Sequence, residues 1–367
     1  MTNLSLSDVA DIVDCEHKTA PIVEGGNFYS IRTTDISNGK IAFEKANRVD
    51  ETTYLEWSKR ATPEPGDIIL AREAPVGEVG WIKEGYKVCL GQRTVLIKPR
   101  HPDIHGRFLL FYLVNPETKY ELQVRSAGSV VAHLNMKDIR AFRITLPPLE
   151  EQKAIASVLS SLDDKIDLLH RQNKTLEAMA ETLFRQWFVE EAQEDWVDGC
   201  LGDVIELVYG KGLKKEIRTG EGYPVVGSSG IVDYHSEFLV EGPGIVIGRK
   251  GTLGKVIYMW DNFYPIDTTY FVKSKVESAG LLYEYFLLKT INFEDMNTDS
   301  AVPGLNRDIA LSTEIKIAPE DKLHSFNELA AKFVGKLEKN KDQIHILEKL
   351  RDTLLPKLMS GEVRVAA

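Results

Sequence analysis

The chain has 367 residues, of which 43% are hydrophobic, and this length is sufficient for two or three domains with cores of their own. Its formal net charge of −10 argues against a chain that binds polyanions over its whole surface, so any nucleic-acid contact must be local. Three cysteines without metal-site spacing, an N-terminus unlike a signal peptide and the lack of a long apolar run predict a cytoplasmic chain that does not span a membrane.

The first segment, residues 1–148, combines short β-branched runs with turns that contain Gly and Pro. One apolar helical pattern, RFLLFYLV, interrupts these runs at residues 107–114. This mixture predicts an α+β domain with a mostly antiparallel or mixed sheet.

A long helical pattern follows over residues 149–195. The proline pair at 147–148 cannot lie inside a helix, and the acidic pair after it suits a helix N-terminus. Apolar residues then recur at alternating steps of four and three, which is the heptad pattern of a coiled coil, interrupted by Asn173. A helix over residues 150–188 would be roughly 57 Å long. The apolar series is Ile155, Leu159, Leu162, Ile166, Leu169, Leu176, Ala180, Leu183 and Trp187.

The next segment, residues 196–318, repeats the pattern of the first and has its apolar helical patch, LLYEYFLLK, at 281–289. SLSDVADIV in the first segment resembles CLGDVIELV in the second, and SVVAHLNMKDI resembles SAVPGLNRDI. GDIILAREAPVGEVG aligns without a gap on PGIVIGRKGTLGKVI. Such internal similarity predicts two domains of one fold.

The ungapped alignment places Arg72 on Arg249 and Gly77 on Gly254. We interpret the two glycines as turn positions, because glycine adopts backbone conformations that other residues avoid. An arginine at the same loop position in two otherwise different copies favours a shared role in binding.

The last segment, residues 319–367, carries a second heptad pattern that includes Asn340 and Arg351. An antiparallel pairing of the two helices places Asn173 opposite Asn340 in one layer. A buried Asn pair fixes the register of a coiled coil at some loss of stability. The same pairing places Arg351 opposite Leu162, and we expect this layer to open to solvent or to a partner subunit.

Signatures of catalysis are absent from the sequence. NPE at 115–117 lacks the second Pro and the aromatic residue of an amino-methyltransferase motif. GRKGTLGKV at 248–256 has the wrong spacing for a phosphate loop, and HPDIH at 101–105 contains a Pro and lacks the Glu of a zinc-protease helix. We therefore predict no catalytic residue and no metal ligand. An enzyme with diverged motifs and a structural adaptor that never touches DNA remain open alternatives.

Residues able to bind DNA occur in loops of both globular segments. Arg and Lys recognise guanine edges, Asn and Gln recognise adenine, and basic side chains also bind phosphates. A solvated loop residue is the alternative for each candidate, and Arg72 and Arg249 are the strongest. The candidates are His17, Lys18, Arg32, Arg72, Gln92, Arg93, His133, Lys211, Lys214, Lys215, Arg249, Lys250, Lys255, Thr268, Thr269 and Asn306.

Four stretches carry a family resemblance: DCEHKTAPIVEGG, PGDIILAREAPVGEVG, HLNMKDIRAFRITLPPLEEQKAIASVLSSLDDKID and EKLRDTLLPKLMSGEV. Over nearly its whole length the chain resembles the specificity subunits of type I restriction–modification systems. The resemblance implies two pseudo-repeated target recognition domains, 1–148 and 196–318, each of which reads half of a bipartite DNA site. It also implies two conserved long helices, 149–195 and 319–367, which form an antiparallel coiled coil that sets the spacer between the half-sites. The second helix begins PEDKLHSF where the first has LEEQKAIA, so its start departs from the commonest family pattern.

The resemblance further implies double-stranded DNA and two methyltransferase (modification) subunits as partners, with ATP-dependent restriction (motor) subunits in the full complex. We expect no cofactor in this chain; S-adenosylmethionine, ATP and magnesium are expected in partner subunits. Apolar residues outside the heptad series would pack on the globular domains or meet the methyltransferase subunits. These residues include Leu168, Phe184, Phe188, Ile346 and Leu355.

Overall fold

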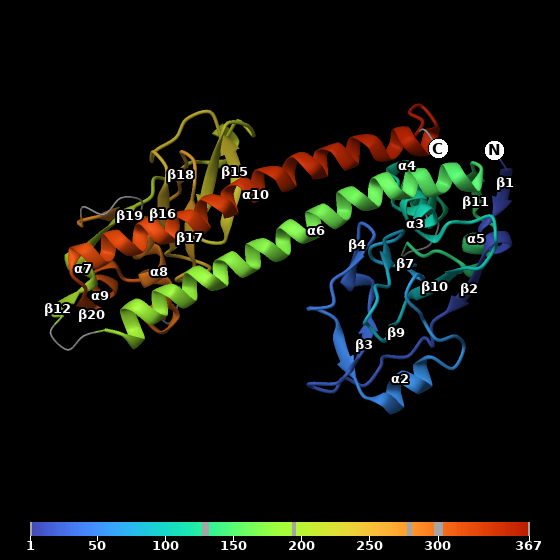
Figure 1. Ribbon diagram of the computed structural model, residues 1–367, viewed down its shortest axis with the longest axis horizontal. Coiled ribbons are helices and arrows are strands. Elements are labelled where there is room, and N and C mark those ends of the chain that lie inside the picture. Colours follow the sequence, from blue (N-terminus) through green and yellow to red (C-terminus); the bar gives the residue numbers. More distant parts are fainter. Residues whose placement is uncertain (1, 127–131, 193–195, 277–280, 297–303, 366–367) are drawn as a thin grey trace. The chain divides into compact units, whose positions relative to one another are not determined.

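The computed structural model divides the chain into two compact units, each of which combines one globular domain with part of each long helix (Figure 1). Unit 1 contains Met1–Asp167 and Ile344–Ala367, and unit 2 contains Leu168–Gln343. The described residues are 2–126, 132–192, 196–276, 281–296 and 304–365.

The central sheet of unit 1 has four antiparallel strands in the order β2 (Ala10–Asp14), β10 (Thr94–Pro99), β7 (Ile68–Ala71) and β8 (Val79–Trp81). Successive side chains of a strand point to opposite faces. Leu70 and Ile97 accordingly enter the core that contains α3 (Gly106–Val114), whereas Ile69 and Leu96 enter a second core on the other face. Burial on both faces explains why these strands are continuously apolar.

A smaller sheet adjoins the second core of unit 1. Its order is β6 (Asn47–Val49), β3 (Phe28–Ile31) and β9 (Val88–Leu90), with β3 antiparallel to β6 and parallel to β9. A two-stranded ribbon of β1 (Thr2–Ser5) and β11 (Arg143–Leu146) leads into the first long helix. The remaining elements are α1 (Leu6–Val9), η1 (Thr33–Asp35), β4 (Ile36–Ser37), β5 (Lys40–Ile41), α2 (Glu51–Trp57), α4 (Pro116–Ser126) and α5 (Met136–Arg140).

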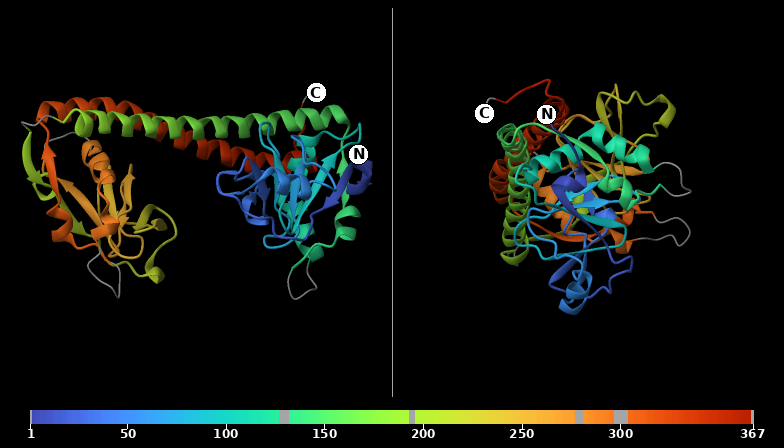
Figure 2. Two further views of the ribbon diagram at one scale, coloured as in Figure 1. Left: turned by 90° about the horizontal axis from the view of Figure 1, so that it is seen from below. Right: turned by 90° about the vertical axis from the view of Figure 1, so that its right-hand side faces the viewer.

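Unit 2 has the same topology, which confirms the predicted repeat and the mostly antiparallel mixed sheet. Its four-stranded sheet is β13 (Ile205–Tyr209), β19 (Thr269–Ser274), β16 (Gly244–Gly248) and β17 (Val256–Met259). Its smaller sheet is β15 (Gly230–His235), β14 (Tyr223–Gly227) and β18 (Tyr264–Pro265), with β14 parallel to β18. α8 (Leu282–Thr290) takes the place of α3 between sheet and long helices (Figure 2). The other elements are β12 (Val197–Cys200), α7 (Leu201–Val204), η3 (Lys215–Ile217), η4 (Phe293–Met296), α9 (Arg307–Leu311) and β20 (Glu314–Ile317).

Gly77 and Gly254 occupy equivalent turns, as the alignment predicts. Their φ angles are +85° and +66°, a region that favours glycine. A Cβ added at Gly254 would also come within 2.5 Å of the Cβ of Phe293. Both positions therefore serve the backbone.

The first long helix, α6 (Leu149–Arg185), begins directly after the proline pair and continues into a π-helical turn, η2 (Gln186–Glu190). Gln152 in its first turn is 1% exposed. The Gln152 amide donates to the carbonyl oxygens of Asp103 and Pro147 and accepts from the backbone N–H of His105. These bonds fix the start of α6 to the first domain.

The second long helix, α10 (Glu320–Ser360), packs antiparallel to α6 within unit 2. Asn340 Nδ2 donates to Asn173 Oδ1 at 2.8 Å, and the rings of Phe184 and Phe326 lie 5.6 Å apart. The later residue of α6 thus contacts the earlier residue of α10, as an antiparallel pair requires. The predicted Asn layer is confirmed. None of the helices within the described residues is long and apolar enough to cross a bilayer.

Within unit 1 the two helices share the core beside α3, to which Ile155, Leu159 and Leu358 contribute. The expectation that Arg351 lies in an open layer is wrong. Its guanidinium Nη1 donates to Asp163 Oδ1 at 3.0 Å, and its side chain is only 19% exposed. The flexible arginine reaches the carboxylate next to Leu162, which satisfies its charge inside the helix pair.

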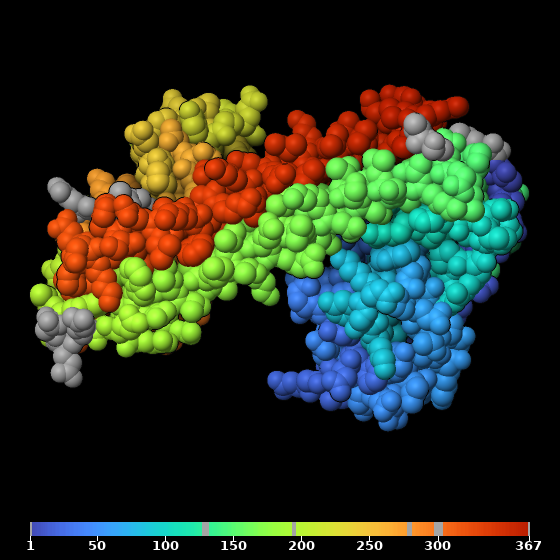
Figure 3. Space-filling view, viewed as in Figure 1, coloured from blue at the N-terminus to red at the C-terminus, as the bar shows by residue number. Residues whose placement is uncertain are grey.

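The apolar residues outside the heptad series divide into two groups. Phe184 and Phe188 contact Tyr283 of the second domain, and Leu355 belongs to the core of unit 1. Leu168 in unit 2 and Ile346 in unit 1 stay 40% and 64% exposed. Figure 3 shows one face of the molecule in space-filling form, with the two long helices in green and red. Most of the set therefore packs on the globular domains.

Candidate nucleic-acid interface

Each domain has a candidate interface of its own, at the loop where its central sheet ends, and the two loops are equivalent. In unit 1 the Arg72 N–H donates to the Arg93 carbonyl oxygen at 2.9 Å, and the Leu134 N–H donates to the Arg72 carbonyl oxygen at 3.0 Å. In unit 2 the N–H of Arg249 donates to the Thr268 carbonyl oxygen, and the Leu305 N–H to the Arg249 carbonyl oxygen, each at 2.9 Å. The two arginines therefore occupy the same backbone position.

The side chain of Arg72 is buried, with the residue only 6% exposed. Its Nη1 donates to both carboxylate oxygens of Asp14, at 2.8 and 2.9 Å. Nε donates to the Leu134 carbonyl oxygen at 3.0 Å, and Nη2 to His133 Nε2 at 2.7 Å. The prediction that Arg72 meets DNA from an exposed loop is corrected, because its guanidinium joins β2, β7 and the loop before α5.

His133 and Glu73 carry this network outward to Arg93. His133 Nδ1 lies 2.7 Å from Glu73 Oε1, and His133 Nε2 lies 2.7 Å from Arg72 Nη2. Because a guanidinium only donates, His133 accepts at Nε2 and donates from Nδ1 to Glu73. Arg93 Nε lies 2.9 Å from Glu73 Oε2, and the Arg93 side chain is 59% exposed. Arg93 and the half-buried His133 are therefore the groups of the network that DNA could reach.

The other first-domain candidates surround this network. The exposed His17 has a φ of +53°, and its carbonyl oxygen accepts from Gln92 Nε2 at 3.1 Å. Lys18 is exposed. Arg32 pairs at 2.7 Å with the buried Asp35 and stays partly exposed. The structure thus brings His17, Gln92, Arg93 and His133 to one edge, with Arg32 in a neighbouring loop.

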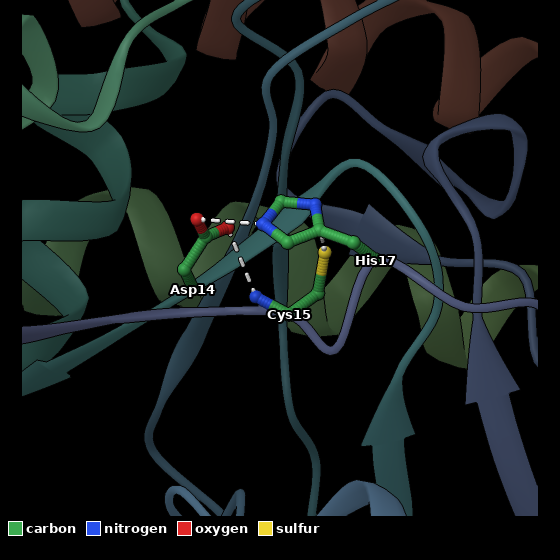
Figure 4. Close-up of side chains that lie close together, drawn as sticks. All are labelled: Asp14, Cys15 and His17. Carbon is green, nitrogen blue, oxygen red and sulfur yellow. Dashed lines mark hydrogen bonds and ion pairs between the residues drawn. The ribbon is translucent and has the colours of Figure 1, made fainter.

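One trio among the described residues has metal-binding side chains close together (Figure 4). Ligand atoms of Asp14, Cys15 and His17 lie within 4.8 Å of one another. Arg72 already occupies both oxygens of Asp14, and Arg60 donates to the carbonyl oxygen of Cys15 at 2.9 Å. Two guanidinium groups oppose a further cation, so we assign the trio to fixing the turn after β2.

In unit 2 the equivalent arginine has different neighbours. The Cζ of Arg249 lies 4.9 Å from the ring centre of Tyr209 and 5.8 Å from that of Tyr270. Its Nη1 donates to the Asp267 carbonyl oxygen at 3.1 Å, and no carboxylate within the described residues lies within 4.0 Å of it. Arg249 is half-exposed. The second domain therefore holds its arginine by cation–π contacts with two tyrosines and by one backbone hydrogen bond.

Tyr270 supports this arrangement from inside the domain. It is 1% exposed, and its hydroxyl donates to the Leu305 carbonyl oxygen at 3.0 Å. Burial, together with the neighbouring Tyr209 hydroxyl, raises the pKa of Tyr270 to about 12. The Tyr270 ring is therefore an uncharged and fixed aromatic surface beneath the guanidinium of Arg249.

The remaining second-domain candidates divide by exposure. Thr269 is fully buried and donates its hydroxyl to the Ile266 carbonyl oxygen at 2.7 Å, so its prediction as a DNA contact is corrected to a structural role. Asn306 caps α9 by accepting from the N–H groups of Asp308 and Ile309. Thr268 is half-buried. Exposed lysines are Lys211, Lys214, Lys215, Lys250 and Lys255, of which Lys255 lines a cavity of about 330 Å³ with Asn173 and Trp260.

Sequence reasoning missed two residues of the second-domain cluster. Tyr209 ends β13 at the position that Asp14 holds in β2, and Arg307 opens α9 directly after Asn306. The repeat alignment contains the signal for Tyr209, since CLGDVIELV ends one residue before it. Arg307 has no such signal, because its proximity to Tyr209 depends on the packing of α9.

Comparison with known proteins decides the family. The sequence pattern described as type I restriction modification DNA specificity domain matches residues 2–178 and 193–352. The chain belongs to this family. Its function is therefore DNA sequence specificity in a type I restriction–modification system. Specificity subunits are non-catalytic components of such systems.

Individual relatives support this membership, some along nearly the whole chain and others over part of it. The specificity subunit of type I restriction enzyme MjaIX from Methanocaldococcus jannaschii is 27% identical and covers 98% of this chain and 93% of its own length. The EcoBI specificity subunit from Escherichia coli is 25% identical over 39% of this chain and 30% of its own length. The crystal structure of an S subunit from M. genitalium has the same fold, with a TM-score of 0.67 and 19% identity over 97% of this chain and 95% of that one.

Proposed function

We propose that this specificity protein recognises a bipartite, asymmetric DNA site and that each globular domain reads one half-site. The observation that carries the proposal is the pair of equivalent loops, which share backbone hydrogen bonds but present different side chains. The first domain offers Arg93, His133, His17 and Gln92, and the second offers Arg249 with Tyr209. Two domains of one fold with different contact residues suit two different half-sites.

The exposed lysines support a complementary role in phosphate binding. Lys211, Lys214, Lys215 and Lys250 lie exposed in the second domain. Basic side chains on flexible stems bind phosphates without reading sequence, and these contacts fix the register of a protein on DNA. Such local contacts are compatible with the acidic net charge of −10.

The long helices would dock partner subunits and set the spacer. Leu168 in unit 2 and Ile346 in unit 1 are exposed apolar side chains of the kind that protein partners cover. We expect two methyltransferase subunits there, with restriction subunits in the full complex and S-adenosylmethionine, ATP and magnesium bound outside this chain. The assembly would act in the cytoplasm, where chromosomal DNA is accessible.

Co-expression of the chain with its cognate methyltransferase subunit tests the proposal. Methylated sites are mapped across the host DNA. The expected result is one motif of two defined blocks separated by a spacer of constant length without sequence preference. Methylation without such a motif, or a chain that co-purifies with the methyltransferase yet directs no methylation, would favour the adaptor alternative.

A variant of helix length tests the role in spacing. α6 runs without interruption from unit 1 into unit 2. Removing whole turns from α6 and matching turns from α10 should change the spacer while leaving both blocks unchanged, since each turn of α-helix rises 5.4 Å. A spacer of unchanged length would contradict the role of the long helices in setting the distance between the half-sites.

A further inference from the structure

In the second domain two guanidinium groups approach the same aromatic ring. The Cζ of Arg249 lies 4.9 Å from the centre of the Tyr209 ring, and the Cζ of Arg307 lies 5.6 Å from the same centre. These residues come from the end of β13, the loop after β16 and the start of α9. Tyr209 is 48% exposed, so this cluster lies at the surface of the candidate interface.

We propose that Tyr209 is a positioning residue that holds Arg249 and Arg307 as a pair, and that this pair recognises a guanine edge in the second half-site. The inference rests on the proposed DNA-recognition function and deepens it. It assigns Arg307 to specificity and gives Tyr209 a role through the two arginines.

The chemistry of the pair favours a base edge with two acceptors. Guanine presents N7 and O6 in the major groove, and the planar fork of a guanidinium donates to both. Arg249 has no carboxylate within 4.0 Å among the described residues, and Arg307 approaches only Asp308, at 3.3 Å on an 82% exposed side chain. Two neighbouring cations with little neutralisation favour a ligand rich in acceptors.

The support behind the pair favours base recognition over phosphate binding. Arg249 donates to the Asp267 carbonyl oxygen, and its second aromatic neighbour, Tyr270, is buried and hydrogen-bonded. A guanidinium held in one orientation loses little freedom on binding and can reject a misplaced acceptor. The exposed lysines nearby are better suited to phosphates, because they are compact charges on flexible stems.

The arrangement is particular to the second domain. Asp14 holds the position of Tyr209 in the first domain and neutralises Arg72. A specificity change caused by Tyr209 must therefore be confined to one half-site, which separates this inference from a general effect on DNA binding.

The test uses the complex of the full chain with its methyltransferase subunit and compares Tyr209→Leu, Tyr209→Phe and Arg307→Ala. In Tyr209→Leu and Arg307→Ala, one guanine position of the second half-site should accept other bases. The preference for guanine over other bases should fall by roughly five- to 150-fold, the range of one bidentate base contact. Tyr209→Phe keeps the ring and should retain the wild-type motif. The first half-site should stay unchanged in all three.

Two results would overturn the inference. One is a wild-type motif in both Tyr209→Leu and Arg307→Ala; the other is uniform weakening at every site with a flatter salt dependence, which indicates phosphate contacts. If Tyr209→Leu fails to fold, Arg307→Ala decides alone, since its side chain is 43% exposed. Failure of the proposed function has a different signature, because the wild-type complex would then yield no two-block motif.

Discussion

The two globular domains hold an arginine at the same place and use it differently. Arg72 is enclosed by Asp14, His133 and the Leu134 carbonyl oxygen, whereas Arg249 stacks on two tyrosines at the surface. The backbone hydrogen bonds of the two loops are the same. The difference arises across the sheet, where β2 ends in Asp14 and β13 ends in Tyr209. An internal repeat thus preserves the position of a side chain without preserving its environment.

The largest expected effect is on stability, and it separates the domains directly. Arg72→Ala leaves Asp14 without its buried partner, a loss of about 3–5 kcal/mol. We expect the unfolding temperature of unit 1 to fall by roughly 6–20 °C in Arg72→Ala. The matched Arg249→Ala should change the unfolding temperature only slightly. Differential scanning calorimetry of the full chain measures both.

A double variant controls this interpretation. Asp14→Leu combined with Arg72→Met replaces the pair by apolar side chains and should recover much of the loss. An Arg72→Ala protein that unfolds at the wild-type temperature would show that the ion pair does not stabilise the first domain.

The next effect concerns specificity. Arg249→Ala should reduce discrimination by about 1–3 kcal/mol at one position of the second half-site, because one base contact is lost. In the first domain the matched variant is Arg93→Ala, since Arg93 is the exposed end of the Arg72 network. Methylation mapping of both complexes reports the affected base pairs. Degradation of the same half-site by both variants would contradict separate recognition by the two domains.

The polar layers of the helix pair offer a second comparison. Unit 2 contains the Asn173–Asn340 layer, and unit 1 contains the Asp163–Arg351 pair. Asn173→Leu leaves Asn340, which is fully buried, without its partner and should cost about 1–3 kcal/mol. Replacing both Asn residues by Leu should be nearly neutral or stabilising, with a less well defined register.

Urea unfolding of the three proteins measures these changes in stability. Disulfide trapping of cysteine pairs placed along the helices then reports the register. A double variant less stable than the single one would argue against the Asn layer as a specificity device.

The smallest effect is pH-dependent and belongs to unit 1. Asp167 on α6 accepts from Lys40 at 2.7 Å and Lys83 at 2.6 Å. Burial by itself raises the pKa of Asp167, but the hydrogen bonds from the two lysines outweigh it, so the pKa is lowered. A lowered folded-state pKa gives stabilisation that is present above the ordinary Asp pKa and lost as pH falls through the folded value.

We therefore expect the unfolding midpoint of wild-type unit 1 to fall more steeply below about pH 4 than that of Asp167→Asn. Asp164→Asn is the matched control, because Asp164 is 76% exposed and lies 3.9 Å from Arg107. If the unfolding midpoints of the wild type and Asp167→Asn depend on pH in the same way, the ion pairs of Asp167 do not help to hold the first domain against α6.

Much of the fold could be predicted because it depends on local and periodic patterns. The proline pairs and heptads place the long helices, and the alignment of GDIILAREAPVGEVG with PGIVIGRKGTLGKVI identifies two domains of one topology. The Asn173–Asn340 layer follows from the series of apolar residues, since two buried amides are most stable when paired. The exposure of His17 and Arg93 in unit 1 and of Arg249 in unit 2 also follows, because loops between strands lie at the surface.

The burial and the partners of individual polar residues in those loops depend on contacts between segments that are distant in the sequence. In the sequence, Thr269 and Arg72 do not differ from exposed loop residues. Thr269 begins β19, as Thr94 begins β10, and both threonines are buried in the sheet. Arg72 is buried because it pairs with Asp14. Arg351 meets Asp163 for the same reason: a charged group settles where a partner lies in space. Internal similarity and heptad periodicity are enough to predict the two domains, the two helices and their register. Which arginine is enclosed and which stays at the surface depends on Asp14, 58 positions away along the chain, in the first domain and on Tyr209 in the second.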